Sequence, residues 1–168
     1  ITADHLRIFP EAKTTNYAPA IRYSREWKKV GAIDALYTFD GEVLEATRSN
    51  FFIVKGNTLV TAKDRILEGI TRRVVLELAF PDFDVQVRRM NIAERADVDE
   101  AFLTGTTKKI TPVVTIDGRP IGAGIPGPKT RELMERFDAF VADYAESRGS
   151  TENVDSINQA NLSRPSGL

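Results

Sequence analysis

Residues 33–61, IDALYTFDGEVLEATRSNFFIVKGNTLVT, decide the fold, because short turns join four β-rich runs within them. Asp40-Gly41 separates the first two runs, and this dipeptide between β-rich runs is the signal of a type I′ hairpin. Lys55-Gly56-Asn57 separates the last two runs in a similar way. The stretch therefore predicts two consecutive antiparallel hairpins. Their strands are Ile33–Phe39, Glu42–Ala46, Phe51–Val54 and Thr58–Thr61.

Helices are predicted on both sides of these strands. Apolar side chains recur at helical spacing in three segments, and glycine or proline stands at their boundaries. Antiparallel strands with flanking helices make an α+β (mixed α/β) domain. We expect this domain at residues 1–148, followed by a flexible tail at 149–168 that is rich in Ser, Asn and Gly. The predicted helices are Asn16–Val30, Thr71–Ala79 and Leu133–Tyr144, with further strands at Val85–Val87, Ala101–Leu103 and Pro112–Ile116.

Composition narrows the class of protein. The 168 residues suffice for one domain, and no apolar run approaches the roughly 18 residues of a membrane helix. The 23 basic and 24 acidic residues are interspersed, which argues against nucleic acid as a partner. The chain has no cysteine and a single histidine, His5, which argues against a metal site. No secretory signal is visible, so a cytoplasmic location is the default expectation.

Two glycine-containing turns are candidate phosphate sites. In Leu67–Arg72, LEGITR, Gly69 admits the chain to a helix whose first N–H groups lack intrahelical partners and can bind an anion. Thr104–Thr107, TGTT, offers hydroxyls and amides after a strand. Taken alone, each turn is better explained as an ordinary loop. Together they suit a compact phosphorylated cofactor, since neither GxxxxGK[ST] nor GxGxxG is present.

Lys13 and Glu45 are candidate reactive groups with plain alternatives. Lys13 precedes the first helix, and a lysine nucleophile needs a pKa lowered by burial or by a neighbouring cation. Most lysines, however, are solvated surface charges, and composition does not distinguish Lys13 from them. Glu45 lies on a predicted strand and could instead be an edge-strand charge.

The order and spacing of four motifs resemble the class IV aminotransferases, which include branched-chain aminotransferases, D-amino-acid aminotransferases and aminodeoxychorismate lyase. The resemblance implies the larger, C-terminal domain of a pyridoxal 5′-phosphate (PLP) enzyme. It also implies a smaller N-terminal domain, which we expect to be absent because the sequence begins twelve residues before Lys13. The motifs are Lys13-x-x-Asn16, Glu45-x-x-x-Ser49-Asn50-Phe51-Phe52, Leu67–Arg72 and Thr104–Val113.

The resemblance assigns the cofactor contacts residue by residue. Lys13 would hold PLP as a Schiff base and move the substrate α-proton. Glu45 would pair with the pyridine nitrogen and keep the ring protonated as an electron sink. Leu67 would pack on the ring. The backbone amides of Ile70 and Thr71 and the hydroxyl of Thr106 would bind the phosphate.

The same resemblance suggests substrate contacts and an activity. Thr107 lies where the family often places a backbone donor for the substrate carboxylate. Arg48 stands where relatives usually carry a small residue, so it either binds a substrate carboxylate or points to solvent. The implied activity moves an amino group between a branched-chain or D-amino acid and a 2-oxo acid, in a homodimer. An aminodeoxychorismate lyase-like enzyme and a truncated, non-catalytic PLP-domain remnant are the alternatives.

Overall fold

The computed structural model describes the backbone of residues 1–149 and the side chains of residues 1–147. Ile1–Phe137 form one compact unit, and a second unit begins at Asp138, within the last helix. The described helices are α1 (Ala18–Lys29), α2 (Ile70–Ala79), the 3-10 helix η1 (Ile92–Ala96) and α3 (Pro128–Gly149). The described strands are β1 (Thr2–Asp4), β2 (Leu36–Phe39), β3 (Glu42–Ala46), β4 (Ser49–Lys55), β5 (Thr58–Thr61), β6 (Asp84–Val87), β7 (Met90–Asn91), β8 (Glu100–Gly105), β9 (Lys109–Pro112), β10 (Thr115–Ile116) and β11 (Arg119–Pro120).

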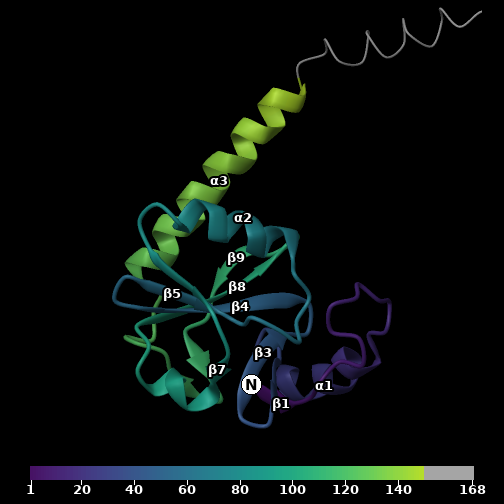
Figure 1. The fold of residues 1–168 in the computed structure, drawn as a ribbon. Coiled ribbons are helices and arrows are strands. Elements are labelled where there is room, and N and C mark those ends of the chain that lie inside the picture. The colour runs from purple at the N-terminus through teal and green to yellow at the C-terminus, as the bar shows by residue number, and fades with distance from the viewer. Residues whose placement is uncertain (150–168) are drawn as a thin grey trace, which may run out of the picture. The chain divides into compact units, whose positions relative to one another are not determined.

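A mixed sheet forms the centre of the first unit (Figure 1). Its main path runs β1-β2-β3-β4-β5-β6, while β8 pairs with β4 and β9, and β7 pairs with β3. β1 with β2 and β5 with β6 are parallel, and the other pairs are antiparallel. Asp40 and Gly41 have φ angles of 50° and 75°, as a type I′ turn requires. Both predicted hairpins are confirmed.

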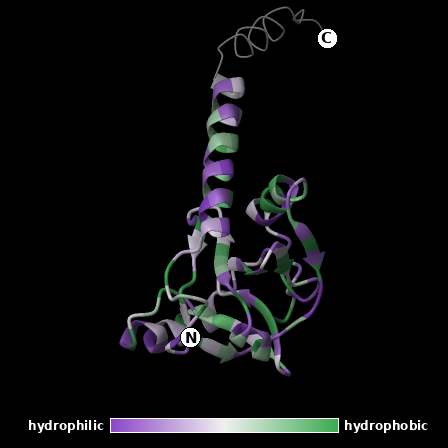
Figure 2. Cartoon of the chain, turned by 90° about the vertical axis from the view of Figure 1, so that its left-hand side faces the viewer, coloured by the Kyte–Doolittle hydropathy of each residue, from purple (hydrophilic) through white to green (hydrophobic). Residues whose placement is uncertain are grey.

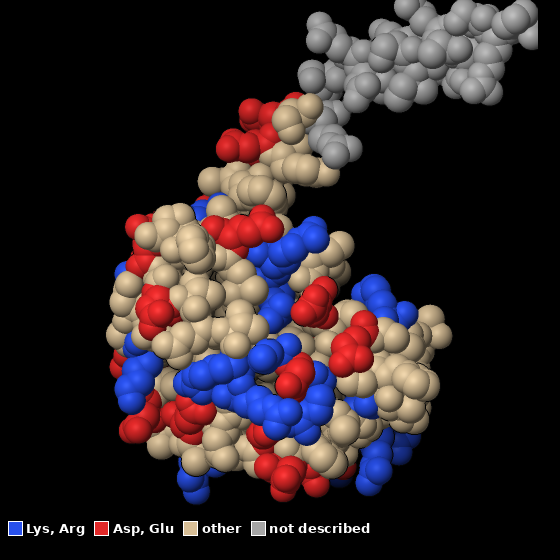
Figure 3. Space-filling model, in the orientation of Figure 1, with Lys and Arg blue, Asp and Glu red and all other residues tan. Residues whose placement is uncertain are grey.

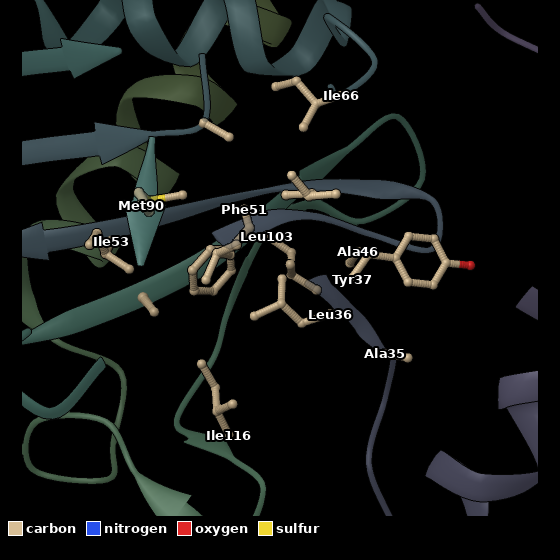
Figure 4. Close-up of a cluster of buried hydrophobic side chains, with 14 of the residues drawn as sticks. Ala35, Leu36, Tyr37, Ala46, Phe51, Ile53, Ile66, Met90, Leu103 and Ile116 are labelled. Carbon is tan, nitrogen blue, oxygen red and sulfur yellow. The ribbon is translucent and has the colours of Figure 1, made fainter. Parts of the chain in front are cut away.

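Strand β4 separates two layers of hydrophobic core, because successive side chains of a strand point to opposite faces. Phe51 and Ile53 belong to one cluster of buried side chains, and Figure 4 shows Phe51 beside Leu103 within it. Phe52 belongs to the other cluster, where its ring stacks on that of Phe102 at 4.9 Å. Figure 2 shows hydrophobic residues gathered in these central strands. Alternation along one strand therefore anchors the sheet on both faces.

The helices cover parts of this sheet. In α2, Val75 and Ala79 are fully buried in the second cluster, which also contains Leu133 and Phe137 from the start of α3. All three predicted helices are present, but α3 extends from Pro128 to Gly149, five residues beyond the predicted Leu133–Tyr144 at each end. In the second unit, the rings of Phe140 and Tyr144 stack at 6.3 Å along α3. The predicted tail, apart from Gly149, lies outside the described residues.

Three strand predictions need correction, and the first is Ile33–Phe39, because β2 begins only at Leu36. The predicted strand Pro112–Ile116 is two separate elements, because β9 ends at Pro112 and β10 forms its own hairpin with β11 around Asp117-Gly118. The Val113 N–H still bonds to the Ala101 carbonyl at 2.8 Å, in register with β8, and the chain then leaves β8 for the second hairpin. The predicted strand Phe51–Val54 begins two residues earlier, at Ser49, so that β3 and β4 also pair.

Charged residues of both signs are intermixed on the face that Figure 3 shows. Among the described residues, ion pairs join Arg88 with Glu94 at 2.7 Å and Arg89 with Asp64 at 3.3 Å. None of the helices within residues 1–149 has the length and apolar character that a membrane span requires.

Candidate active site

The four motifs meet at a cavity of about 240 Å³ in the first unit. Its walls come from the loop before α1, the β3–β4 turn, the start of α2 and the β8–β9 turn. Every predicted site residue except Thr107 contributes to the lining. The lining residues among them are Lys13, Glu45, Arg48, Leu67, Ile70, Thr71 and Thr106.

Glu45 is a buried carboxylate in the sheet, not an edge-strand charge. Strand β3 lies between β2 and β4, and Glu45 is 4% exposed. One oxygen, Oε1, accepts a hydrogen bond from Arg7 at 2.8 Å. The other, Oε2, accepts one from the Leu67 N–H at 3.1 Å and a longer one from Asn50 at 3.5 Å. Burial raises the pKa of Glu45, while the bonds from Arg7 and Leu67 oppose that rise.

Arg7 is a site residue that sequence reasoning missed. Its guanidinium donates to Glu45 and also to the carbonyl oxygens of Pro10, at 3.0 Å, and Ala12, at 2.7 Å. Arg7 thus connects the buried carboxylate to the backbone immediately before Lys13. A lone arginine in a short extended segment carries no local pattern that could have identified this contact.

Lys13 lies on the loop between β1 and α1, where its side chain is exposed. The same loop contributes Thr14, Asn16 and the half-exposed ring of Tyr17 to the cavity. Lys13 therefore reaches the cavity from a segment without strand or helix.

The start of α2 presents uncapped backbone amides to the cavity. Gly69 occupies the N-cap position, and no side chain bonds to the first turn of the helix. The amides of Ile70 and Thr71 are among those that lack an intrahelical partner at such a terminus. Gly69 is needed for close packing, because a Cβ there would overlap the Asn50 Oδ1 atom. Asn50 in turn donates to the Leu67 carbonyl at 2.6 Å.

Two buried hydroxyls in the cavity wall lack hydrogen-bond partners. Ser49 is 6% exposed and Thr104 is 1% exposed, and both line the cavity. A buried hydroxyl without a partner costs about 1–3 kcal/mol. These groups, which the sequence did not single out, are available to a polar ligand. Thr106 and Thr107 are exposed on the turn that follows.

Arg48 adds a positive charge to the wall. It occupies the two-residue turn between β3 and β4 and is exposed, and its side chain forms no hydrogen bond or ion pair with any residue that the structure describes. A cation in this position can bind an anionic group of a ligand.

These groups fit a phosphorylated pyridine aldehyde. Free amides and unpartnered hydroxyls suit a phosphate, the buried carboxylate suits a protonated ring nitrogen, and the Lys13 amine suits an aldehyde. Within residues 1–149, no group of three or more His, Asp or Glu side chains is arranged to hold a metal ion.

Residues 2–116 match the family model described as Amino-transferase class IV. The chain belongs to this family. It is 34% identical over 138 residues to the D-alanine aminotransferase of Bacillus licheniformis, covering 80% of this chain and 49% of that protein. It is 43% identical over 106 residues to a probable branched-chain-amino-acid aminotransferase of Aquifex aeolicus, covering 61% of this chain and 34% of that protein.

Solved structures agree with the family and with the predicted fold class. The PLP form of the branched-chain amino acid aminotransferase from Thermobaculum terrenum matches with a TM-score of 0.73 and 36% identity, over 79% of this chain and 45% of that one. A putative branched-chain amino acid aminotransferase from Thermotoga maritima matches with a TM-score of 0.73 and 32% identity, over 86% and 56%. The chain therefore spans about half the length of these class IV aminotransferases.

Proposed function

We propose that this chain is the larger, PLP-binding domain of an aminotransferase that moves an amino group between an amino acid and a 2-oxo acid. The observation that carries the proposal is the cavity in which a lysine, a buried carboxylate and an uncapped helix N-terminus meet. The domain corresponds to residues 1–148. The two relatives named for D-alanine and branched-chain amino acids support a branched-chain or D-amino acid as substrate.

Bound PLP would supply an electron sink for the negative charge that develops at the substrate Cα atom. Glu45 would hold the proton on the ring nitrogen, as an ionised carboxylate facing that nitrogen does. Arg7 and the Leu67 N–H favour this ionised form against the effect of burial. Leu67 would contact the face of the ring.

Backbone and hydroxyl donors would bind the phosphate. The amides of Ile70 and Thr71 lie at the positive end of the α2 dipole, which favours an anion. Thr106 would add its hydroxyl from the opposite turn. Because Ser49 and Thr104 lack partners in the same wall, they are further donors for this ligand.

Lys13 would hold the cofactor covalently, and its Nζ atom would carry the proton to and from the substrate Cα atom. The substrate carboxylate would be bound by the backbone at Thr107 and by the unpaired guanidinium of Arg48. Homodimerisation and a cytoplasmic location stay predictions of the sequence analysis.

The cofactor assignment is tested with the complete protein. PLP is added, the sample is reduced with borohydride, and the labelled peptide is mapped. The expected result is a pyridoxyl group on Lys13 and none in the Lys13→Ala variant. A label on Lys28, Lys29 or Lys108 instead would refute the assignment. A labelled protein without transamination would favour the non-catalytic remnant, and light scattering tests the dimer.

A further inference from the structure

Asp34, just before β2, is a buried carboxylate to which the proposed chemistry gives no role. It is 8% exposed and lies outside the cavity lining. Its Oδ1 atom accepts hydrogen bonds from the Ala35 N–H at 2.9 Å and from the Thr47 hydroxyl at 2.5 Å. Its Oδ2 atom accepts one from the Lys108 ammonium at 2.5 Å. The Asp34 carboxylate therefore accepts hydrogen bonds from three donors.

Two of these donors belong to different turns of the cavity wall. Thr47 shares the β3–β4 turn with Arg48, and Lys108 shares the β8–β9 turn with Thr106. The ladder between β4 and β8 ends at Asn50 opposite Thr104, just short of the two turns. Asp34 joins them through side chains, with Lys108 lying 74 residues further along the chain.

The spacing between the two turns is tight. A Cβ added to Gly105 would lie 3.4 Å from the Arg48 carbonyl and 3.3 Å from the Ser49 hydroxyl. Lys108 is also held at its backbone, where its carbonyl accepts a bond from the Thr111 hydroxyl at 3.0 Å. A change in the Asp34 contacts would therefore move Thr106 relative to Arg48.

A buried ion pair is seldom the most stable choice for a site, because desolvation of both charges offsets their attraction. The side chains of Asp34 and Lys108 are 6% and 27% exposed. Such a pair instead fixes the relative positions of its groups, because each donor must point at a particular oxygen of Asp34.

We propose that Asp34 and Lys108 are positioning residues that set the spacing between the β3–β4 and β8–β9 turns, and so the placement of Thr106 and Arg48 around the ligand. The identity of that ligand as PLP rests on the proposed function. The spacing itself is a property of the ligand-free chain.

The test uses the complete protein and two readouts. Amide hydrogen exchange of the ligand-free protein reports on residues 104–111, and titration with PLP gives the dissociation constant. Lys108→Met leaves Asp34 buried without its cation and can fail to fold, so the deciding variant is Asp34→Asn/Lys108→Met, which removes both charges. Lys108→Arg is the conservative variant. The matched control is Lys55→Met/Asp97→Asn, which removes an exposed pair at 3.8 Å.

The double variant is expected to fold, to exchange faster at residues 104–111 and to bind PLP about tenfold more weakly, within the coupling expected for one polar network. Lys108→Arg is expected to keep both the exchange at residues 104–111 and the PLP dissociation constant near their wild-type values. The control pair is expected to change neither quantity. Wild-type exchange at 104–111 in a folded double variant would overturn the proposal. If wild-type protein fails to bind PLP, the proposed function fails, while the exchange data still decide the positioning role.

Discussion

The cavity has two walls of different construction. The sheet wall carries Glu45, Asn50 and Thr104, which are all buried and lie on adjacent strands in register, Glu45 opposite Asn50 and Asn50 opposite Thr104. The loop wall carries Lys13 on an exposed segment, and the Arg7 guanidinium bonds to its backbone at Pro10 and Ala12.

The sheet wall therefore sets the charges that a ligand meets, whereas the loop wall sets where Lys13 lies. In the sheet wall, register and core packing hold each side chain, because a slip of one residue would turn every side chain to the other face. A substitution there that preserves shape should change charge alone. In the loop wall, Arg7 connects the loop to Glu45, so a substitution of Arg7 should change the position and mobility of the loop that carries Lys13.

The largest expected effect is that of Glu45→Gln in the sheet wall. The amide keeps the shape but cannot hold a proton on the ring nitrogen, so PLP should remain bound while kcat falls about 100-fold, as for loss of one preorganised electrostatic group. Steady-state kinetics and PLP absorbance of the complete protein measure both quantities. Glu68→Gln, an exposed carboxylate of the same cavity, is the control. Near-normal kcat in Glu45→Gln would show that the charge of the sheet wall is not used.

Arg7→Met probes the loop wall. Loss of three bonds should loosen residues 8–17 and slow labelling of Lys13 by PLP and borohydride about tenfold, since about 1.4 kcal/mol of lost placement corresponds to that factor. Hydrogen exchange and labelling rates measure the change, with the exposed Arg25→Met as control. Unchanged exchange at 8–17 would mean that the loop is held without Arg7.

The same variant has a pH signature. Arg7 lowers a pKa that burial raises, so its removal should raise the pKa of Glu45 further. A group whose pKa is raised on folding favours the folded state in its protonated form, so that stability is lost as pH rises through the folded pKa. The free energy of unfolding of Arg7→Met should therefore lie below that of wild type by an amount that shrinks towards acid pH, as denaturant unfolding measures. A deficit that grows towards acid pH would contradict this.

Gly69→Ala tests the junction of α2 with the sheet wall. The added Cβ would overlap Asn50, so we expect a loss of about 1–3 kcal/mol in the free energy of unfolding. The double variant Gly69→Ala/Asn50→Ala removes the overlapping amide and should recover part of the loss. Chemical denaturation measures both. If Gly69→Ala is as stable as wild type, the close approach does not constrain this junction.

The smallest effect is expected outside both walls, at Glu94 in η1. The hydrogen bond from Arg88 lowers the pKa of Glu94, so its stabilisation is present above the unfolded pKa and is lost as pH falls through the folded value. Because the Glu94 side chain is 34% exposed and solvent screens the pair, Glu94→Gln should cost less than about 1 kcal/mol at neutral pH and nothing in strong acid. Altered PLP affinity in this variant would show that the cavity walls are not independent of this region.

Local sequence determined the elements of this protein. Asp40-Gly41 specifies its hairpin because few other dipeptides accept two positive φ angles, and Gly69 with Pro81 brackets α2. The order of the four motifs was enough to predict the family that the comparisons then established. Such signals are read from the sequence because the interactions behind them join residues only a few positions apart.

Tertiary structure alone decided how the walls are held together. Arg7 meets Glu45 across 38 positions, and Asp34 meets Lys108 across 74. The unpartnered hydroxyls of Ser49 and Thr104 lie beside the cavity on neighbouring strands, β4 and β8. No periodicity or turn signal encodes such contacts, since they depend on which strands become neighbours in the sheet. Long-range pairing therefore sets the geometry of residues whose chemical types the sequence already contains.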